Sequence, residues 1–425
     1  MEYTSISKYI YIYIYIYCIL LYMIYDIIII GGGISGLYSA YKLEQISPDT
    51  TYLILEKNKI LGGRAHNDIF YNTNIVTGAG IGRNKKDKLL LKLIKDLNLS
   101  TNEFAIDYTY SKLIDKPVNI ISIMKTLKNK LNNNYLHMTF KEYFIKIFDK
   151  NLYNKFKITS GYTDYENEDV YDVLYHYGMD DNYCCNIGNT IPWNDIIISL
   201  SNIIGINNIK LLEEVTKIIN NNNKYIIKCK NNNIYYTNKI IFASTIDTII
   251  KLLPEYKIYK EIHAQIFLRV YGKFSKMSIP IIKDYIKNTI IVPNELQKII
   301  PIDSNKGIYM IAYCDNNNAK KLHKYLDNTM TNRNIFCKLI MESIGIDKSE
   351  KIKLIAIKSF YWNIGTHYYE PLSNDYKNRI EYIHKAQHPE KNIIVVGEMI
   401  SLHQGWTEGA LESIEKVLTK KFVNK

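Results

Sequence analysis

The sequence contains little arginine for a chain with a formal net charge of +12. Nearly all of its basic residues are lysines, and the arginines are Arg64, Arg83, Arg269, Arg333 and Arg379. Base recognition and bidentate phosphate contacts favour arginine. The lysines are scattered, with no basic stripe interleaved with aromatic residues. We therefore expect no nucleic-acid partner and interpret the charge as a solvated, lysine-rich surface.

Cysteine motifs are also missing. The six cysteines stand at positions 18, 184, 185, 229, 314 and 337, with no CxxC pair and no histidine at ligand spacing. Such a set is too sparse for a disulfide framework and lacks the spacing of a zinc site. The adjacent Cys184 and Cys185 could be redox-active, although two ordinary free thiols are the simpler interpretation. The sequence predicts no metal site and fits a reducing compartment such as the cytoplasm.

One long hydrophobic run is present, at residues 9–25, where tyrosine and isoleucine largely alternate. It is at the short limit for a membrane span, which takes about 20 apolar residues. It also continues without a linker into residues 26–30, which the next motif requires to be a central strand. We predict that residues 1–22 are a dispensable low-complexity extension and that the protein makes no membrane contact. A membrane anchor through residues 9–25 is the less favoured alternative.

A glycine-rich turn follows four consecutive isoleucines and reads Gly31-Gly32-Gly33-Ile34-Ser35-Gly36. The pattern predicts a strand, a tight turn, a helix and a second strand at residues 51–55. Gly31 permits the turn, Gly33 lets the backbone approach a pyrophosphate, and Gly36 lets the helix pack on the strand. The pyrophosphate would lie beside Ile34 and Ser35, where free N–H groups and the helix dipole favour anions.

The residues after this unit favour FAD over NAD. Glu56 stands about 20 residues beyond the turn, where a carboxylate binds ribose hydroxyls. A second glycine pair with a cation follows closely, as Leu61-Gly62-Gly63-Arg64-Ala65. In this arrangement the sequence resembles the flavin-containing amine oxidase family, which includes monoamine, polyamine and L-amino-acid oxidases. The resemblance implies that Arg64 lies beside the FAD phosphates, whose charge its planar cation would offset.

The resemblance extends over nearly the whole chain after residue 23. Val215 falls on the strand whose backbone holds the adenine, and the family's segment passing the flavin ring is similar to Gly78-Ala79-Gly80-Ile81. The most specific match is Gly397-Glu398 followed by residues 405–413, GWTEGALES. It implies that Glu398 accepts hydrogen bonds from FAD hydroxyls and that the helix start at Thr407 faces the flavin pyrimidine. A helix N-terminus there favours the reduced, negatively charged flavin.

Two aromatic residues indicate the substrate. The resemblance places Trp406 and Tyr368 as opposite walls of an aromatic cage, where cation–π and apolar contacts would orient an amine. In a chain with 38 tyrosines, Tyr368 could equally be a core residue. His367 falls near the position of the family's flavin-bonded cysteine, and no cysteine is near, so we expect non-covalent FAD. The family's flavin-proximal lysine has no counterpart, because Gln265 or Phe267 stands at its position.

These observations predict an α/β fold, with a split Rossmann-like FAD-binding domain and an inserted α+β substrate-binding domain. We assign residues 23–85, 186–250 and 372–425 to the FAD-binding domain, and residues 86–185 and 251–371 to the substrate-binding domain.

The expected function is FAD-dependent oxidation of a monoamine, polyamine or amino acid by hydride transfer to flavin N5, with O2 or another electron acceptor. The alternatives are a flavin dehydrogenase or desaturase acting on a C–C bond, and a flavin-binding protein without turnover. Similarity to amine-oxidase-like proteins of giant DNA viruses would imply the host cytoplasm or the virion.

Overall fold

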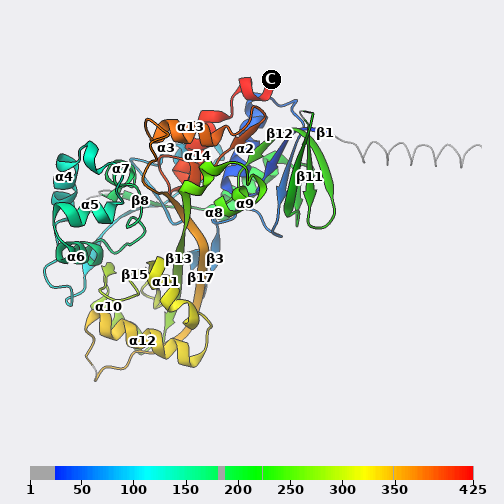
Figure 1. Ribbon diagram of the computed structural model, residues 1–425. Coiled ribbons are helices and arrows are strands. Elements are labelled where there is room, and N and C mark those ends of the chain that lie inside the picture. The colour runs from blue at the N-terminus through cyan, green and yellow to red at the C-terminus, as the bar shows by residue number, and fades with distance from the viewer. Residues whose placement is uncertain (1–23, 180–186, 223, 348, 425) are drawn as a thin grey trace, which may run out of the picture.

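The computed structural model describes residues 24–179, 187–222, 224–347 and 349–424. Within them the chain forms two large sheets, each with its own helices (Figure 1). The predictions for residues 1–22 lie outside the described residues, as do Cys184 and Cys185. The proposed anchor through residues 9–25 does too, apart from Ile24 and Tyr25, which begin the first strand. Among the described residues, no helix is long and apolar enough to cross a membrane.

The first sheet has seven strands in the order β10-β11-β12-β1-β2-β9, with β18 paired to β12. They are β1 (Ile24–Ile30), β2 (Tyr52–Glu56), β9 (Ile209–Leu211), β10 (Val215–Asn221), β11 (Lys224–Cys229), β12 (Ile234–Phe242) and β18 (Ile393–Val395). β1 pairs in parallel with β2 and β12, while β12 pairs with β11 near its start and with β18 near its end. Three stretches far apart in the sequence therefore meet in one sheet.

The isoleucines of β1 are buried on both faces of this sheet. Ile27 and Ile29 belong to a core shared with α2 (Ile34–Ile46), α8 (Trp193–Ile204) and α14 (Thr407–Val417). Ile28 and Ile30 belong to a second core, with α9 (Ile246–Leu252) and α13 (Arg379–Gln387). Successive side chains of a strand point to opposite faces, so a strand covered on both sides requires an unbroken apolar run. The predicted strand, turn, helix and strand are present as β1, α2 and β2.

The second sheet has six strands in the order β17-β13-β16-β15-β14-β7. They are β7 (Tyr108–Tyr110), β13 (Ile262–Phe274), β14 (Thr289–Ile291), β15 (Lys298–Asp303), β16 (Ile308–Asp315) and β17 (Leu354–Tyr369). The long pair β13 and β17 runs from the first sheet's side of the molecule towards α11 (Asn316–Leu322) and α12 (Met330–Ile344) (Figure 1). Leu268 and Val270 of β13 pack in the core with α12, so Arg269 between them points to the opposite face.

Four helices form a separate aromatic core beside this sheet. They are α4 (Ile120–Lys130), α5 (Phe140–Ile147), α6 (Lys150–Ser160) and α7 (Val170–Tyr175). Phe140, Phe144 and Phe156 are completely buried between them. Thr139 and Glu142 form a capping box that fixes the start of α5.

Shorter elements complete the fold. They are α3 (Lys88–Asp96), α10 (Ser278–Tyr285), α15 (Lys420–Asn424), β3 (Asn67–Ile69), β4 (Asn74–Val76), β5 (Ile81–Arg83), β6 (Glu103–Ala105), β8 (Ile187–Thr190) and 3₁₀ turns at Asn133–Tyr135, Ile206–Asn208, Lys257–Glu261, His323–Tyr325 and Glu398–Ile400.

Candidate nucleotide-binding and active site

A cavity of about 1300 Å³ is lined by residues of both sheets. Ligand cavities for drug-sized molecules are usually about 300–1,000 Å³, so this one has room for an extended dinucleotide. Most of the predicted cofactor residues line it: Gly31, Gly33, Ile34, Ser35, Glu56, Arg64, Gly78, Ala79, Gly80, Ile81, Glu398, Trp406 and Thr407. The fold thus gathers the N-terminal glycine turn and the C-terminal motif around one space.

The glycine turn gives the cavity an anion-binding end. Gly31 has a φ of +112°, and a Cβ on Gly36 would stand 1.9 Å from the Gly31 carbonyl oxygen. Gly36 therefore packs α2 against β1 and does not line the cavity. A Cβ on Gly33 would meet nothing within 4 Å. α2 begins at Ile34 with no side-chain cap and no acidic residue in its first turn, so its first N–H groups can bind an anion.

Glu56 is held at the end of β2 with acceptor capacity remaining. Its Oε2 accepts a hydrogen bond from the Gly32 amide at 2.7 Å. Its Oε1 accepts bonds from the backbone and the side-chain amide of Asn58, both at 2.8 Å. A carboxylate has about four acceptor positions. One position is therefore left for a hydroxyl in the cavity, as the predicted ribose contact requires.

Glu398 joins three separate segments of the cavity wall. Its oxygens accept bonds from the Arg64 guanidinium at 3.0 Å, the Gly405 amide at 2.9 Å, and both the backbone amide and Nδ1 of His367 at 2.9 Å. Burial alone would raise the pKa of Glu398, but His367 and Arg64 hold it well below its usual range. Four donors fill the carboxylate. A bond to a flavin hydroxyl would require one of them to be displaced.

Arg64 contacts the cavity-lining segment at residues 78–81 through its backbone carbonyl. The Arg64 guanidinium donates to the Gly365 carbonyl at 2.7 Å as well as to Glu398. The Arg64 carbonyl accepts from the Ala79 amide at 2.8 Å, and a Cβ on Gly78 would stand 2.2 Å from that carbonyl oxygen. Gly78 therefore permits this approach, which positions residues 78–81 along the cavity.

Trp406 lines the cavity and immediately precedes α14, which has no side-chain cap. The Arg83 guanidinium lies 3.5 Å from the centroid of the indole ring, and Arg83 is itself paired with Asp87 at 2.6 Å. One face of Trp406 is therefore covered by a cation of the protein. The other face is the one that can contact a ligand.

Tyr368, predicted as the opposite wall of the aromatic cage, is not among the residues that line the cavity. His367, the preceding residue of β17, does line the cavity, whereas the Tyr368 ring lies 5.2 Å from the ring of His263 on β13. Tyr361 and Trp362, earlier on β17, line the cavity instead. The Trp362 indole N–H donates to the Thr77 carbonyl at 2.8 Å.

Two further predicted residues lie behind the wall. Val215 is buried at the start of β10, in the core beside β11 and β12, and does not line the cavity. Gly397, with a φ of +130°, donates its amide hydrogen to Ser413 on α14 at 2.8 Å. Gly397 thus attaches the loop after β18 to α14.

Sequence reasoning missed a polar wall on the second sheet. Gln265 and Phe267 line the cavity, but so do Arg269 on the same strand and Lys298 on β15. A cavity lysine is therefore present, on a different strand from the one that the resemblance indicated. Alternation along β13 could have indicated Arg269, since every second residue of a strand shares a face.

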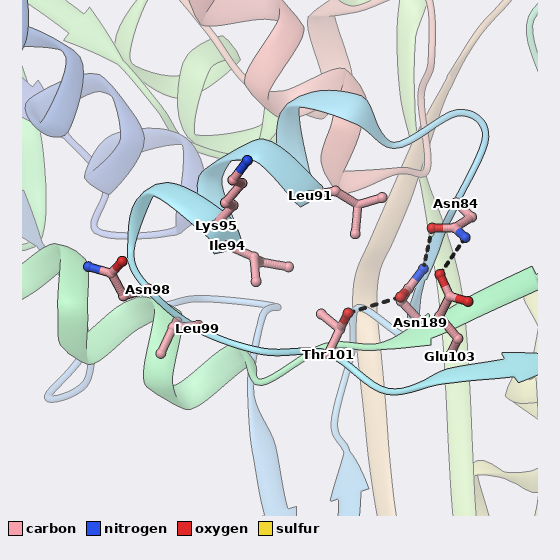
Figure 2. A pocket seen from close by; sticks show the side chains of 9 residues that line it. All are labelled: Asn84, Leu91, Ile94, Lys95, Asn98, Leu99, Thr101, Glu103 and Asn189. Carbon is pink, nitrogen blue, oxygen red and sulfur yellow. Dashed lines mark hydrogen bonds between the residues drawn. The ribbon is translucent and has the colours of Figure 1, made fainter.

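A second depression, of about 490 Å³, lies beside α3 and β6 (Figure 2). Asn84 donates to Glu103 at 2.6 Å, and Asn189 donates to Asn84 at 3.1 Å. Thr101 donates to Asn189 at 2.9 Å. These side chains largely satisfy one another, so the larger cavity is the candidate site. Within the described part of the chain, no group of histidine, cysteine and acidic side chains is arranged to hold a metal ion.

Comparison with known proteins agrees with this geometry. The NAD(P)-binding Rossmann-like domain family matches residues 29–83. An uncharacterized protein of Acanthamoeba polyphaga mimivirus is 23% identical, over 93% of this chain and 94% of that one.

Solved structures of putrescine oxidase are also similar. A double mutant with redesigned cofactor binding superposes with a TM-score of 0.72 at 12% identity, covering 95% of this chain and 100% of that one. The wild-type enzyme bound to putrescine gives the same TM-score and identity, with 93% and 98% covered. The chain therefore has a mixed α/β fold with a Rossmann-like domain, and its overall architecture is similar to that of putrescine oxidase.

Proposed function

We propose that the chain is an FAD-dependent oxidoreductase that oxidises an amine. The observation that carries the proposal is that two helix N-termini without side-chain caps, those of α2 and α14, open onto one cavity. FAD has two parts that such termini favour, its pyrophosphate and the pyrimidine edge that gains negative charge on reduction. The fold shared with putrescine oxidase, a cofactor-binding enzyme, supports the same interpretation.

The chain offers a place for each part of FAD. The amides beside Gly33 would hold the pyrophosphate, Glu56 a ribose, and Arg64 would offset phosphate charge. Gly78 to Ile81 would run along the flavin ring, and the amide of Thr407 would face its pyrimidine. FAD would be held without a covalent bond. The three described cysteines, Cys229, Cys314 and Cys337, do not line the cavity.

When bound, FAD would accept the hydride equivalent that leaves the α-carbon of a neutral amine. The protein's task is to position that carbon and exclude water. The open face of Trp406 and the ring of Trp362 would orient the amine, and the apolar side chain of Phe267 would help to keep water out. Trp406 would be the residue in contact with substrate, and Tyr368, which lies off the cavity, is no longer proposed for this role.

The test is anaerobic mixing of the flavin-loaded protein with monoamines, polyamines and amino acids. We expect at least one of them to bleach the flavin absorbance, and air to restore it if O2 is the acceptor. If dithionite bleaches the flavin and no amine does, amine oxidation is refuted. A dehydrogenase acting on C–C bonds, or a flavin-binding protein without turnover, would then take its place.

A further inference from the structure

Arg269 is a buried cation on the cavity wall without an acidic partner. It is only 8% exposed, yet no carboxylate oxygen of the described residues lies within 4.0 Å of its guanidinium. Its contacts include the Tyr313 ring, 4.4 Å from the guanidinium carbon, the Met310 sulfur at 3.9 Å, and the neutral side chain of Tyr271. A guanidinium taken out of water without a counter-charge is unfavourable. An anion supplied by a ligand would remove that penalty.

The other buried arginines of the described chain each have the acidic partner that Arg269 lacks. Arg379 is comparably buried and pairs with Asp172 at 2.7 Å and Asp169 at 3.6 Å. Arg83 pairs with Asp87 at 2.6 Å. Arg379 and Arg83 are not among the residues that line the cavity, and each has an acidic partner, whereas Arg269 on the cavity wall has none within 4.0 Å among the described residues.

Lys298 adds a second basic side chain to the same wall. Its ammonium nitrogen lies 2.8 Å from the Tyr162 ring centroid and 5.5 Å from that of Tyr313. Burial holds the pKa of Lys298 well below its usual range, against the opposing effect of Asp315 and Asp164.

The nearby acids are already hydrogen-bonded. Asp315 accepts hydrogen bonds from the backbone amide and hydroxyl of Thr163 and from Gln297. Asp164 accepts one from the Tyr177 hydroxyl. Neither acid reaches Arg269 within 4.0 Å.

Gly80 lies next to the Arg269 guanidinium and has no side chain to cover it. A Cβ on Gly80 would stand 3.4 Å from one terminal nitrogen of Arg269 and 3.9 Å from the other. Gly80 belongs to the segment proposed to run along the flavin ring. A group bound by Arg269 would therefore lie close to the reacting end of the cavity.

We propose that Arg269 and Lys298 form an anion subsite, and that the substrate carries a carboxylate in addition to its amine. The inference rests on the proposed function and narrows it to amino acids or related amino-carboxylates. The planar guanidinium matches a carboxylate with two parallel hydrogen bonds. A diamine such as putrescine would bring a second ammonium group towards Arg269, and like charges in a buried site repel each other.

The test uses the flavin-loaded protein and two probes, benzoate, which has a carboxylate and no amine, and benzylamine, which has an amine and no carboxylate. Benzoate binding is followed by the shift it causes in the flavin absorption spectrum. We expect Arg269→Gln to weaken benzoate binding about 10- to 100-fold, as loss of a charge-assisted pair does. Benzylamine binding should be unchanged or improved, and flavin content should stay the same. Arg333→Gln is the matched control, because Arg333 is bonded to Asn328 away from the cavity.

The outcomes separate this inference from the proposed function. Unchanged benzoate binding in Arg269→Gln overturns the subsite, and so does loss of flavin with unchanged benzoate affinity per bound flavin. Loss of benzoate binding in a protein that no amine reduces keeps the subsite and refutes amine oxidation.

If Arg269→Gln does not fold, the unmodified protein decides. Faster flavin reduction by phenylalanine than by phenethylamine supports the subsite, and the reverse order overturns it.

Discussion

Replacing Gly33 with alanine should separate cofactor binding from folding. Gly33 has a φ of −74° and a ψ of −177°, which any residue adopts, and its Cβ would meet no atom within 4 Å. The fold should therefore accept alanine, with a stability change of at most about 1 kcal/mol, in the stabilising direction because the unfolded chain loses entropy. The new methyl group would fill the space where the pyrophosphate approaches the N-terminus of α2.

The expected loss in affinity follows from the hydrogen bonds that this methyl group prevents. Each bond between an amide and a charged phosphate contributes about 1.5–3 kcal/mol, so losing one or two should weaken FAD binding at least about tenfold. The assay is titration of apoprotein with FAD by flavin fluorescence, paired with thermal unfolding of the apoprotein.

Gly36→Ala is the contrasting variant. Its Cβ would stand 1.9 Å from the Gly31 carbonyl oxygen, so it should lower the unfolding free energy itself, by about 1–3 kcal/mol. Wild-type FAD affinity in Gly33→Ala would refute the assignment of the pyrophosphate to this turn.

Further expectations concern the wall and the cofactor linkage. Glu398→Gln should lower the unfolding free energy by about 3 kcal/mol. This is the low end for breaking a buried ion pair, because 30% of the Arg64 side chain is exposed. Glu412→Gln on α14 is the control for thermal unfolding. Because the pKa of Glu398 is depressed, its charge stabilises the fold at neutral pH, and this stabilisation is lost as the pH falls below the ordinary value of 4.5. The difference in unfolding free energy between wild type and Glu398→Gln should therefore shrink in acid. A difference that stays constant with pH would show that the charge of Glu398 is not the cause. Tyr368→Phe should leave amine-dependent flavin reduction within about twofold of wild type, whereas Trp406→Ala should slow it at least about tenfold; equal effects would restore Tyr368 to the site. Acid precipitation should release the flavin into the supernatant, and a yellow pellet would show a covalent bond.

Local patterns were enough to predict the glycine turn and the strand end that line one part of the cavity. The run of isoleucines in β1 and the glycines after it act within a few residues of one another, and their burial and turn geometry follow from strand alternation and missing Cβ atoms. Glu56 at the end of β2 follows from the same unit. These features depend little on how the rest of the chain folds.

The part of the cavity formed by the second sheet depends on strand pairings that the sequence does not display. Tyr368 follows His367, which lines the cavity, on a strand whose pairing with β13 shifts register between Gln265 and Phe267, so the sequence did not show which of the two side chains faces the cavity. Lys298 is placed by the pairing of β15 with β14, where it lies opposite Ile291, and by the pairing of β15 with β16. Of the four donors to Glu398, one comes from Gly405 in the same motif, but the other three come from the distant residues Arg64 and His367, which no local motif indicates.

The most direct measurement of the central claim is the binding stoichiometry of FAD to the purified chain, by equilibrium dialysis with the absorption spectrum recorded. We expect one FAD per chain, a yellow protein, and no displacement of that FAD by an excess of NAD⁺. A colourless protein that takes up no added FAD, or one in which NAD⁺ competes for the same cavity, would contradict it.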